Sequence, residues 1–277
     1  MLKQRVITAV IAAPLIIALI FLAKASVFAT LLGLIFLLGM WEWTRMAAVP
    51  NRFLRAGCLA GYALAFALLW HVCKTPWWWL PVLVGLVWWL LALVWLAHHR
   101  FGAGTTPGHV VLKLVAGLLV VAPAWCALVV LHGDLAKPST GYGHWWVLFF
   151  ACVVVAADIG AYSAGRRWGH VKLAAAISPG KTRAGVYGAL ICSGGVGLVG
   201  GALLRIPAGR LPGVVALALV TVLFSVIGDL FESLMKRHAG VKDSGVLFPG
   251  HGGMLDRMDS IVAALPIFVL GKFLLGL

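Results

Sequence analysis

Long apolar segments separated by short polar loops run along the whole chain. We predict nine helices, at about residues 6–23, 27–43, 57–73, 77–97, 110–131, 145–165, 185–204, 213–236 and 260–276. Most of them have about the 17–25 residues that a helix needs to cross the hydrocarbon core of a bilayer. Glycine and proline interrupt several segments, which membrane helices tolerate because neighbouring helices satisfy the freed backbone groups. The pattern predicts an all-α, polytopic integral membrane protein.

The composition supports this fold class. Hydrophobic residues make up 62% of the chain and charged residues only 11%, whereas an ordinary soluble domain has about 25% charged residues. A water-soluble core is therefore excluded. The net charge is +14, but the basic residues lie between apolar segments and not on a soluble module. We therefore expect anionic headgroups and anionic substrates as partners, and no nucleic acid.

The distribution of basic residues predicts the topology. With the N-terminus inside, most of the 22 lysines and arginines fall in inner loops, as the positive-inside rule requires. Nine spans then place the N-terminus in the cytoplasm and the C-terminus outside. The first span could instead be a cleaved signal peptide, because residues 23–25 resemble a cleavage site, but its apolar length favours a retained helix. Most tryptophans, including those at 77–79, 88–89 and 145–146, are expected in interfacial belts.

The acidic residues are few and concentrated. Six of the eight lie in the C-terminal half, at Asp158, Asp229, Glu232, Asp243, Asp256 and Asp259. Carboxylates at membrane depth are costly, so such a concentration indicates a functional site.

One face of the eighth predicted helix carries a polar stripe of Ser225, Asp229, Glu232, Ser233 and Lys236, which share that face by helical spacing. Glu232 and Lys236 alone are consistent with a helix end that emerges into solvent with a surface ion pair. Asp229 does not fit that interpretation, because its neighbours are apolar. We therefore expect the stripe to face inward.

A glycine-rich segment follows at 242–253, and Asp256 and Asp259 come after it. Asp259 alone is equally well explained as a residue that complements a helix N-terminus. Glycines let backbone N–H groups point at an anion, and Lys236, Arg237, Lys242 and Arg257 add positive charge. Carboxylates that bind Mg²⁺, together with cations that meet phosphate oxygens, are what phosphoryl or nucleotidyl transfer needs.

A second polar segment spans 158–183. Asp158 and Tyr162 share a helix face, and a Gly180-Lys181-Thr182 tripeptide follows. The tripeptide resembles a P-loop, but Ala175 stands where that motif has glycine and no strand is expected before it. A loop that binds an anionic headgroup or a triphosphate remains open, and so does a purely topological role for the arginines.

The residues from Ser233 to Asp259 resemble the signature of the phosphatidate cytidylyltransferases, also called CDP-diacylglycerol synthases. The signature positions are Ser233, Met235, Lys236, Arg237, Lys242, Asp243, Gly245, Phe248, Pro249, His251, Gly252, Gly253, Met254, Asp256, Arg257, Met258 and Asp259. Segments 158–166, 178–182 and 228–230 also resemble this family, and the N-terminal half does so only as a hydrophobic pattern. Gly180 and Ala184 depart from the family, which usually has a basic residue and a glutamate there.

The resemblance implies a metal-dependent nucleotidyltransferase that transfers CMP from CTP to phosphatidic acid, giving CDP-diacylglycerol and pyrophosphate. It implies a bacterial-type inner (plasma) membrane protein whose active site faces the cytoplasm. We divide the chain into N-terminal transmembrane helices at 1–140 and a C-terminal transmembrane catalytic region at 141–277, within one continuous membrane domain. A homodimer is compatible with this architecture.

The resemblance also suggests roles for individual residues. The catalytic set is Asp229, Asp243, Asp256, Asp259, Lys242 and Arg257, and Asp229 and Asp256 are the expected metal ligands. The substrate-binding set is Ser178, Lys181, Thr182, Arg183, Lys236, Arg237, Gly250, His251, Gly252, Gly253, Asp158 and Tyr162. The expected cofactor is Mg²⁺ at two cation positions, and a monovalent cation is also compatible with the site.

Two rival functions are compatible with the pattern. A transporter would also carry acids inside the membrane and glycine-broken helices, but no inverted repeat is visible. A lipid kinase that uses CTP would leave CDP in place of pyrophosphate.

Overall fold

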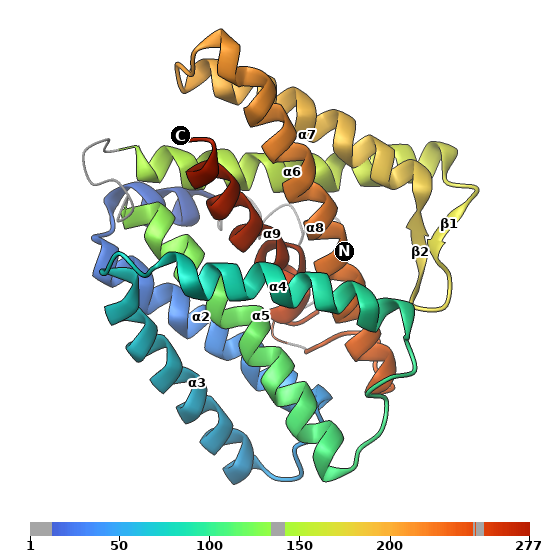
Figure 1. Ribbon diagram of the computed structural model, residues 1–277. Helices are drawn as coiled ribbons and strands as arrows, with labels where there is room; N and C mark the ends of the chain where they lie inside the picture. Colours follow the sequence, from blue (N-terminus) through green and yellow to red (C-terminus); the bar gives the residue numbers. More distant parts are fainter. Residues whose placement is uncertain (1–12, 134–141, 246, 248–251) are drawn as a thin grey trace.

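The computed structural model describes residues 13–133, 142–245, 247 and 252–277 (Figure 1). An apolar helix at Ala13–Leu22 is the first described element. The further elements are α2 (Ala25–Met46), α3 (Arg52–Cys73), α4 (Trp79–Ala97), α5 (Pro107–Gly133), α6 (Gly143–Trp168), β1 (Lys172–Ala174), β2 (Ser178–Thr182), α7 (Arg183–Leu203), a 3₁₀ turn (Ala208–Arg210), α8 (Leu211–His238) and α9 (Leu255–Leu274).

Seven helices, α2 to α8, are long and apolar enough to cross a membrane. Within the described residues, each predicted apolar segment coincides with a helix, and the bounds differ by a few residues at several ends. The all-α, polytopic membrane fold is therefore confirmed. The described part of the first predicted span is helical at Ala13–Leu22, and α9 carries charged residues at both ends.

Helix α5 forms the centre of the N-terminal half. It packs against α2, α3 and α4, and it also reaches α6 and α9. In its most apolar stretch 78% of the residues are buried, against 17% in α3. A helix that is apolar all round is expected either inside a bundle or against lipid. Helix α5 lies inside the bundle, whereas α3 lies at its surface, with Leu64 and Leu68 of α3 each 60% exposed.

The C-terminal half is a series of paired helices in which α6 packs on α7, α7 on α8, and α8 on α9. The α8–α9 pair is especially close at Gly228. A Cβ atom at this position would collide with the carbonyl oxygen of Asp259 and the side chain of Ala263. Small residues allow such close backbone approach between membrane helices. Gly228 therefore brings together the two helix segments that carry Asp229 and Asp259.

A β-hairpin interrupts the otherwise helical fold between α6 and α7. Lys172 pairs with Thr182 and Ala174 with Ser178, in antiparallel register. The sequence analysis expected a loop here, because segment 178–182 contains proline and glycine and lacks the alternation of a typical strand. The side-chain oxygen of Thr182 accepts a hydrogen bond from the Gly185 amide at 3.1 Å, which caps α7.

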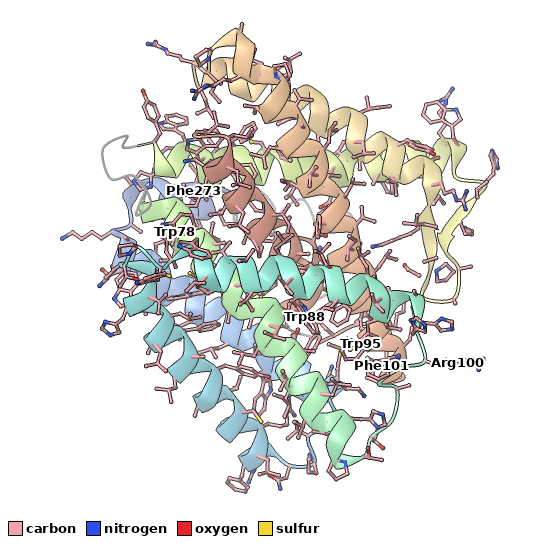
Figure 2. The ribbon with its side chains drawn as sticks, in the orientation of Figure 1. Trp78, Trp88, Trp95, Arg100, Phe101 and Phe273 are labelled. Atoms are coloured by element: carbon pink, nitrogen blue, oxygen red, sulfur yellow. The ribbon has the colours of Figure 1, made fainter. Side chains whose placement is uncertain are left out.

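The tryptophans only partly follow the predicted interfacial belts. Trp77 and Trp145 are 60% and 49% exposed, as belt residues should be, but Trp88, Trp89 and Trp95 are buried. These three rings surround Phe231 of α8, with centroid distances of 5.8, 5.8 and 5.6 Å. Figure 2 shows Trp88 and Trp95 on α4. The prediction is wrong for these residues because α4 packs against α5, α8 and α9.

Candidate active site

A cavity of about 390 Å³ lies among α6, β2, α7 and α8. Residues from both polar segments of the sequence line it, including Asp158, Tyr162, Lys181, Thr182 and Asp229. Asp158 and Tyr162 come from α6, Lys181 and Thr182 from β2, and Asp229 from α8. The fold therefore brings the polar stripe and the second polar segment together in one site. Ser225, the first residue of the polar stripe, also reaches the cavity.

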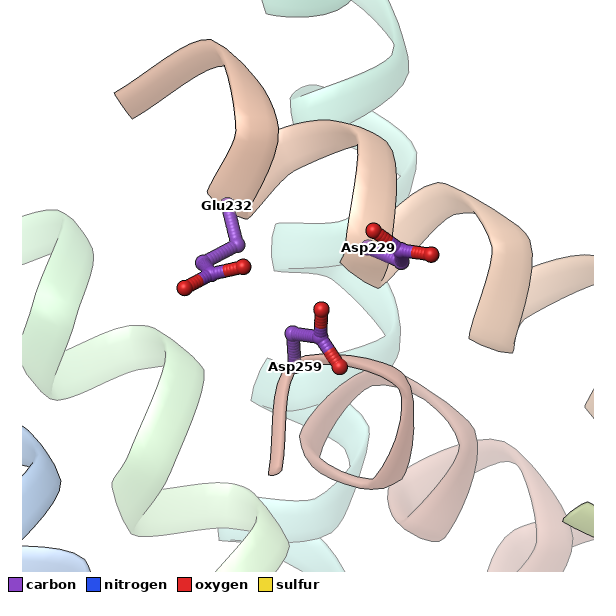
Figure 3. Close-up of side chains that lie close together, drawn as sticks. All are labelled: Asp229, Glu232 and Asp259. Carbon is purple, nitrogen blue, oxygen red and sulfur yellow. The ribbon is translucent and has the colours of Figure 1, made fainter. Parts of the chain in front are cut away.

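Three carboxylates form a compact group next to this cavity. Asp229 and Glu232 lie about one turn apart on α8, and Asp259 faces them from α9 (Figure 3). Each offers one oxygen, and these oxygens lie within 4.8 Å of one another. Oxygen ligands from carboxylates are what a hard divalent cation such as Mg²⁺ prefers. We call Asp229, Glu232 and Asp259 the carboxylate group.

Glu232 does not have the solvated environment that its spacing to Lys236 suggests. The predicted ion pair exists, with Lys236 Nζ 2.8 Å from Glu232 Oε2, but Glu232 is only 3% exposed. Its other oxygen, Oε1, is buried and has no hydrogen-bond partner among the described residues. The interpretation as a solvated helix end is therefore wrong, and the whole polar stripe faces inward.

Two lysines balance the negative charge. Lys181 of β2 forms an ion pair with Asp229, and Lys236 Nζ lies 2.8 Å from Glu232 and 2.6 Å from Asp256. Buried carboxylates need such partners, because an uncompensated buried charge is strongly destabilising. Lys236 thereby connects the carboxylate group to Asp256.

Asp256 lies in the first turn of α9 with both oxygens engaged. Lys236 contacts Oδ1 at 2.6 Å, and Oδ2 accepts hydrogen bonds from Ser244 N and Gly253 N at 2.9 and 2.8 Å. Ser244 Oγ lies 2.9 Å from the same Oδ2, and it shares its single hydrogen between Asp256 and Glu42. Burial opposes ionisation of Asp256, but the hydrogen bonds from Lys236 and the Gly253 amide outweigh it and lower its pKa to about 2. Asp256 is therefore a fixed carboxylate beside the carboxylate group, and its expected role as a metal ligand stays a prediction.

Of the other predicted residues, Tyr162 lines the cavity, whereas Ser178, Arg183 and Arg237 do not. Arg237 donates to the carbonyl oxygen of Ile177 at 3.3 Å, which ties the β-hairpin to α8. Ser178 begins β2, Arg183 begins α7, and the Arg183 side chain is exposed. Tyr162 accepts a hydrogen bond from Arg166 at 2.8 Å.

The loop before α9 contains the remaining predicted residues. Lys242 and Asp243 are exposed, and so is Arg257 on the first turn of α9. Gly252 has a φ of +81°, a backbone conformation that residues other than glycine rarely adopt. The expected roles of Gly250 and His251 lie outside the described residues.

Glu42, on α2, is a residue that the sequence analysis did not assign to the site. Its carboxylate accepts hydrogen bonds from Ser244 Oγ at 2.9 Å, Met254 N at 3.1 Å and Leu255 N at 2.9 Å. These partners are about 200 positions away along the chain, so spacing could not reveal them. The available signal was an acid inside an apolar span, between Trp41 and Trp43.

Comparison with known proteins places the chain in a family. The model of the cytidylyltransferase family matches residues 3–274. A phosphatidate cytidylyltransferase of Pseudomonas aeruginosa is 38% identical over 97% of this chain and 96% of that protein. One of Haemophilus influenzae is 33% identical over 97% of both chains, and one of Brucella suis is 43% identical over 56% of this chain and 55% of that protein. The chain therefore belongs to the cytidylyltransferase family and is a nucleotidyltransferase of the membrane.

Proposed function

We propose that the protein transfers CMP from CTP to phosphatidic acid, forming CDP-diacylglycerol and pyrophosphate with Mg²⁺ as cofactor. The observation that carries this proposal is the carboxylate group beside a cavity lined by Lys181, Thr182 and Asp229. The relatives that match nearly the whole chain are phosphatidate cytidylyltransferases, which supports the choice of substrates.

The reaction is a displacement at phosphorus. An oxygen of the phosphatidate phosphate forms a bond to the α-phosphorus of CTP, and the bond from that phosphorus to the bridging oxygen of the β-phosphate breaks. Pyrophosphate leaves with the electron pair. Because the attacking phosphate is already an anion, the protein needs no strong general base, and its tasks are to orient the two substrates and to neutralise charge.

Lys181 is the cation best placed for charge neutralisation. It lines the cavity and pairs with Asp229, so a phosphate oxygen that enters the cavity meets a positive charge already oriented by the protein. Helix α7 starts at Arg183, directly after Thr182, and its N-terminus favours an anion in the same region. We propose that the CTP phosphates bind here.

The carboxylate group would hold the metal ion. Its all-oxygen donors fit Mg²⁺, and so does the buried Oε1 of Glu232, which has no hydrogen-bond partner in the described part of the chain. When bound, Mg²⁺ would neutralise charge that builds on the phosphate oxygens. Asp256, which is linked to Glu232 through Lys236, is our candidate for a second cation position.

Exposed residues near α9 complete the proposed site. We propose that Lys242 and Arg257, which are exposed, meet phosphate charge, and that Asp243, next to Lys242, supports them. We propose that this side of the protein faces the cytoplasm, where CTP is present, and that the protein resides in an inner membrane.

Position-specific labelling of CTP tests this function. Purified protein, phosphatidic acid and Mg²⁺ would be mixed with CTP labelled on either the α- or the γ-phosphorus. We expect the α label in the lipid fraction and the γ label in pyrophosphate, with neither product formed when phosphatidic acid is omitted. Transfer of the γ label to lipid would indicate a kinase, and no transfer of either label by folded protein would contradict the proposal.

A further inference from the structure

Glu42 is a buried carboxylate in the N-terminal half of the chain. Only 8% of it is exposed, and it lies on α2 among apolar neighbours. A charge in such a place is costly unless hydrogen bonds satisfy it. The donors that do so come from the segment between α8 and α9 and from the start of α9, so Glu42 joins the two halves of the protein next to the site.

Two of these donors are the backbone N–H groups at the beginning of α9. Met254 N and Leu255 N donate to Glu42 at 3.1 and 2.9 Å. The first N–H groups of a helix have no partner within the helix, and the side chain of the residue before α9, Met254, makes no capping hydrogen bond. Glu42 therefore supplies the cap from another helix, and its negative charge also complements the α9 dipole.

The third donor links Glu42 to Asp256. Ser244 Oγ lies 2.9 Å from Glu42 Oε2 and 2.9 Å from Asp256 Oδ2, and Ser244 is fully buried. Arg45, three residues after Glu42 on α2, donates to the Ser244 carbonyl. A continuous series of contacts therefore leads from α2 through Ser244 and Asp256 to Lys236.

The backbone around Ser244 lies directly against this carboxylate. A Cβ atom at Gly245 or Gly253 would overlap the Glu42 side chain, and at Gly253 it would also overlap Ser244 Oγ. Both glycines are therefore needed for the loop to approach Glu42, and the position of Glu42 in turn limits the conformations that this loop can take.

From these contacts we propose that Glu42 is a positioning residue for cytidylyl transfer. It holds Ser244 and the start of α9, and it thereby orients Asp256 and, through Asp256, Lys236 beside the carboxylate group. This role rests on the proposed function, and Glu42 itself does not touch the cavity.

Glu42→Gln is the main test, because it keeps the size of the side chain but replaces one accepting oxygen with an NH₂ group. We expect kcat per folded molecule to fall roughly 10–100-fold, the loss typical of removing a group that orients a metal-site residue, while KM for CTP changes little. Thr44→Val is the matched control: Thr44 is also buried on α2, but it bonds to Trp41 and Arg55 and not to the loop. Its kcat should match that of the wild type.

Hydrogen exchange gives a readout that does not depend on activity. In Glu42→Gln, the amides of Met254 and Leu255 should exchange at least ten-fold faster, and those of α5 should be unchanged. If exchange at the start of α9 is unchanged, the positioning role of Glu42 is wrong. If the wild type shows no cytidylyl transfer, the proposed function is wrong, and the exchange result still decides whether Glu42 holds the start of α9.

The measurement of kcat per folded molecule distinguishes a positioning role of Glu42 from a merely structural one. If Glu42→Gln only reduces the folded fraction and keeps wild-type kcat per folded molecule, the proposal is wrong. Should this variant not fold, Ser244→Ala removes the hydroxyl link alone and should lower kcat over the same range; wild-type kcat in Ser244→Ala would also overturn the proposal.

Discussion

Lys236 lies between two carboxylates, and its removal should lower the stability of the folded protein. It contacts Glu232 at 2.8 Å and Asp256 at 2.6 Å. Lys236→Met would remove this cation from both carboxylates, and breaking a buried pair costs about 3–5 kcal/mol. We expect the unfolding temperature in detergent to fall by roughly 6–20 °C.

The control for this prediction is Lys172→Met, because Lys172 is an exposed lysine of the β-hairpin. Its unfolding temperature should stay within about 2 °C of the wild type, as is usual for surface substitutions. Equal unfolding temperatures in the two variants would show that Lys236 does not balance the buried carboxylates.

Removal of Lys181, in contrast, should lower activity and leave the unfolding temperature nearly unchanged. Its side chain is 21% exposed at the cavity, so loss of its charge disturbs folding less than it disturbs a bound phosphate. Lys181→Met should lower kcat/KM for CTP about 10²–10³-fold, the loss typical of one preorganised donor, with an unfolding temperature near that of the wild type. Wild-type kcat/KM would exclude a role in neutralising phosphate charge.

Sequence reasoning at the residue scale succeeded where the local context was unusual. Asp229 has apolar neighbours on its helix, and this alone indicated an inward-facing carboxylate. Glu232 and Lys236 form a spacing that surface helices use as well, so the burial of Glu232 could not be read from the sequence. Glu42 was missed because its partners are distant along the chain and are mostly backbone groups.

At the scale of elements, the contact between α8 and α9 assembles the carboxylate group. Gly228→Ala would place a Cβ atom against the Asp259 carbonyl oxygen and Ala263. Overpacking of this kind typically costs about 1–3 kcal/mol, and it would also move Asp259 away from Asp229 and Glu232. We expect both a lower unfolding temperature and a loss of cytidylyl transfer.

Gly195→Ala on α7 is the matched control, because a Cβ atom there meets nothing within 4 Å. Alanine favours a helix over glycine by about 0.5–1 kcal/mol, so this variant should be as stable as the wild type or slightly more stable. If Gly228→Ala behaves like Gly195→Ala in both measurements, the close α8–α9 contact is not required.

The existence of the elements was easier to predict than their packing. Long apolar runs predicted the helices because few other structures satisfy the backbone inside a membrane. The same runs do not show which helix lies inside the bundle, because α5 and α8 are alike in hydropathy although 78% of the apolar stretch is buried in α5 and 44% in α8. For the same reason the tryptophans of α4 were expected in lipid belts and not around Phe231.

At the scale of the whole molecule, the topology remains a prediction that labelling can check. In a variant without the native cysteines, Asp243→Cys places a thiol at an exposed position of the loop before α9, and Arg210→Cys places one at the other end of α8. An impermeant thiol reagent should label Arg210→Cys in intact cells. It should label Asp243→Cys only after the membrane is permeabilised, and the reverse result would contradict a cytoplasmic active site.

The central claim is that the carboxylate group supports metal-dependent cytidylyl transfer. The most direct measurement is pyrophosphate release from CTP and phosphatidic acid across a Mg²⁺ titration, for the wild type and Asp229→Asn. Thr221→Val, a buried change on the same helix away from the cavity lining, is the control. We predict that excess chelator abolishes release, that Asp229→Asn lowers it by more than about 100-fold, and that Thr221→Val keeps wild-type release. Undiminished release in chelator, or Asp229→Asn as active as Thr221→Val, would contradict the account.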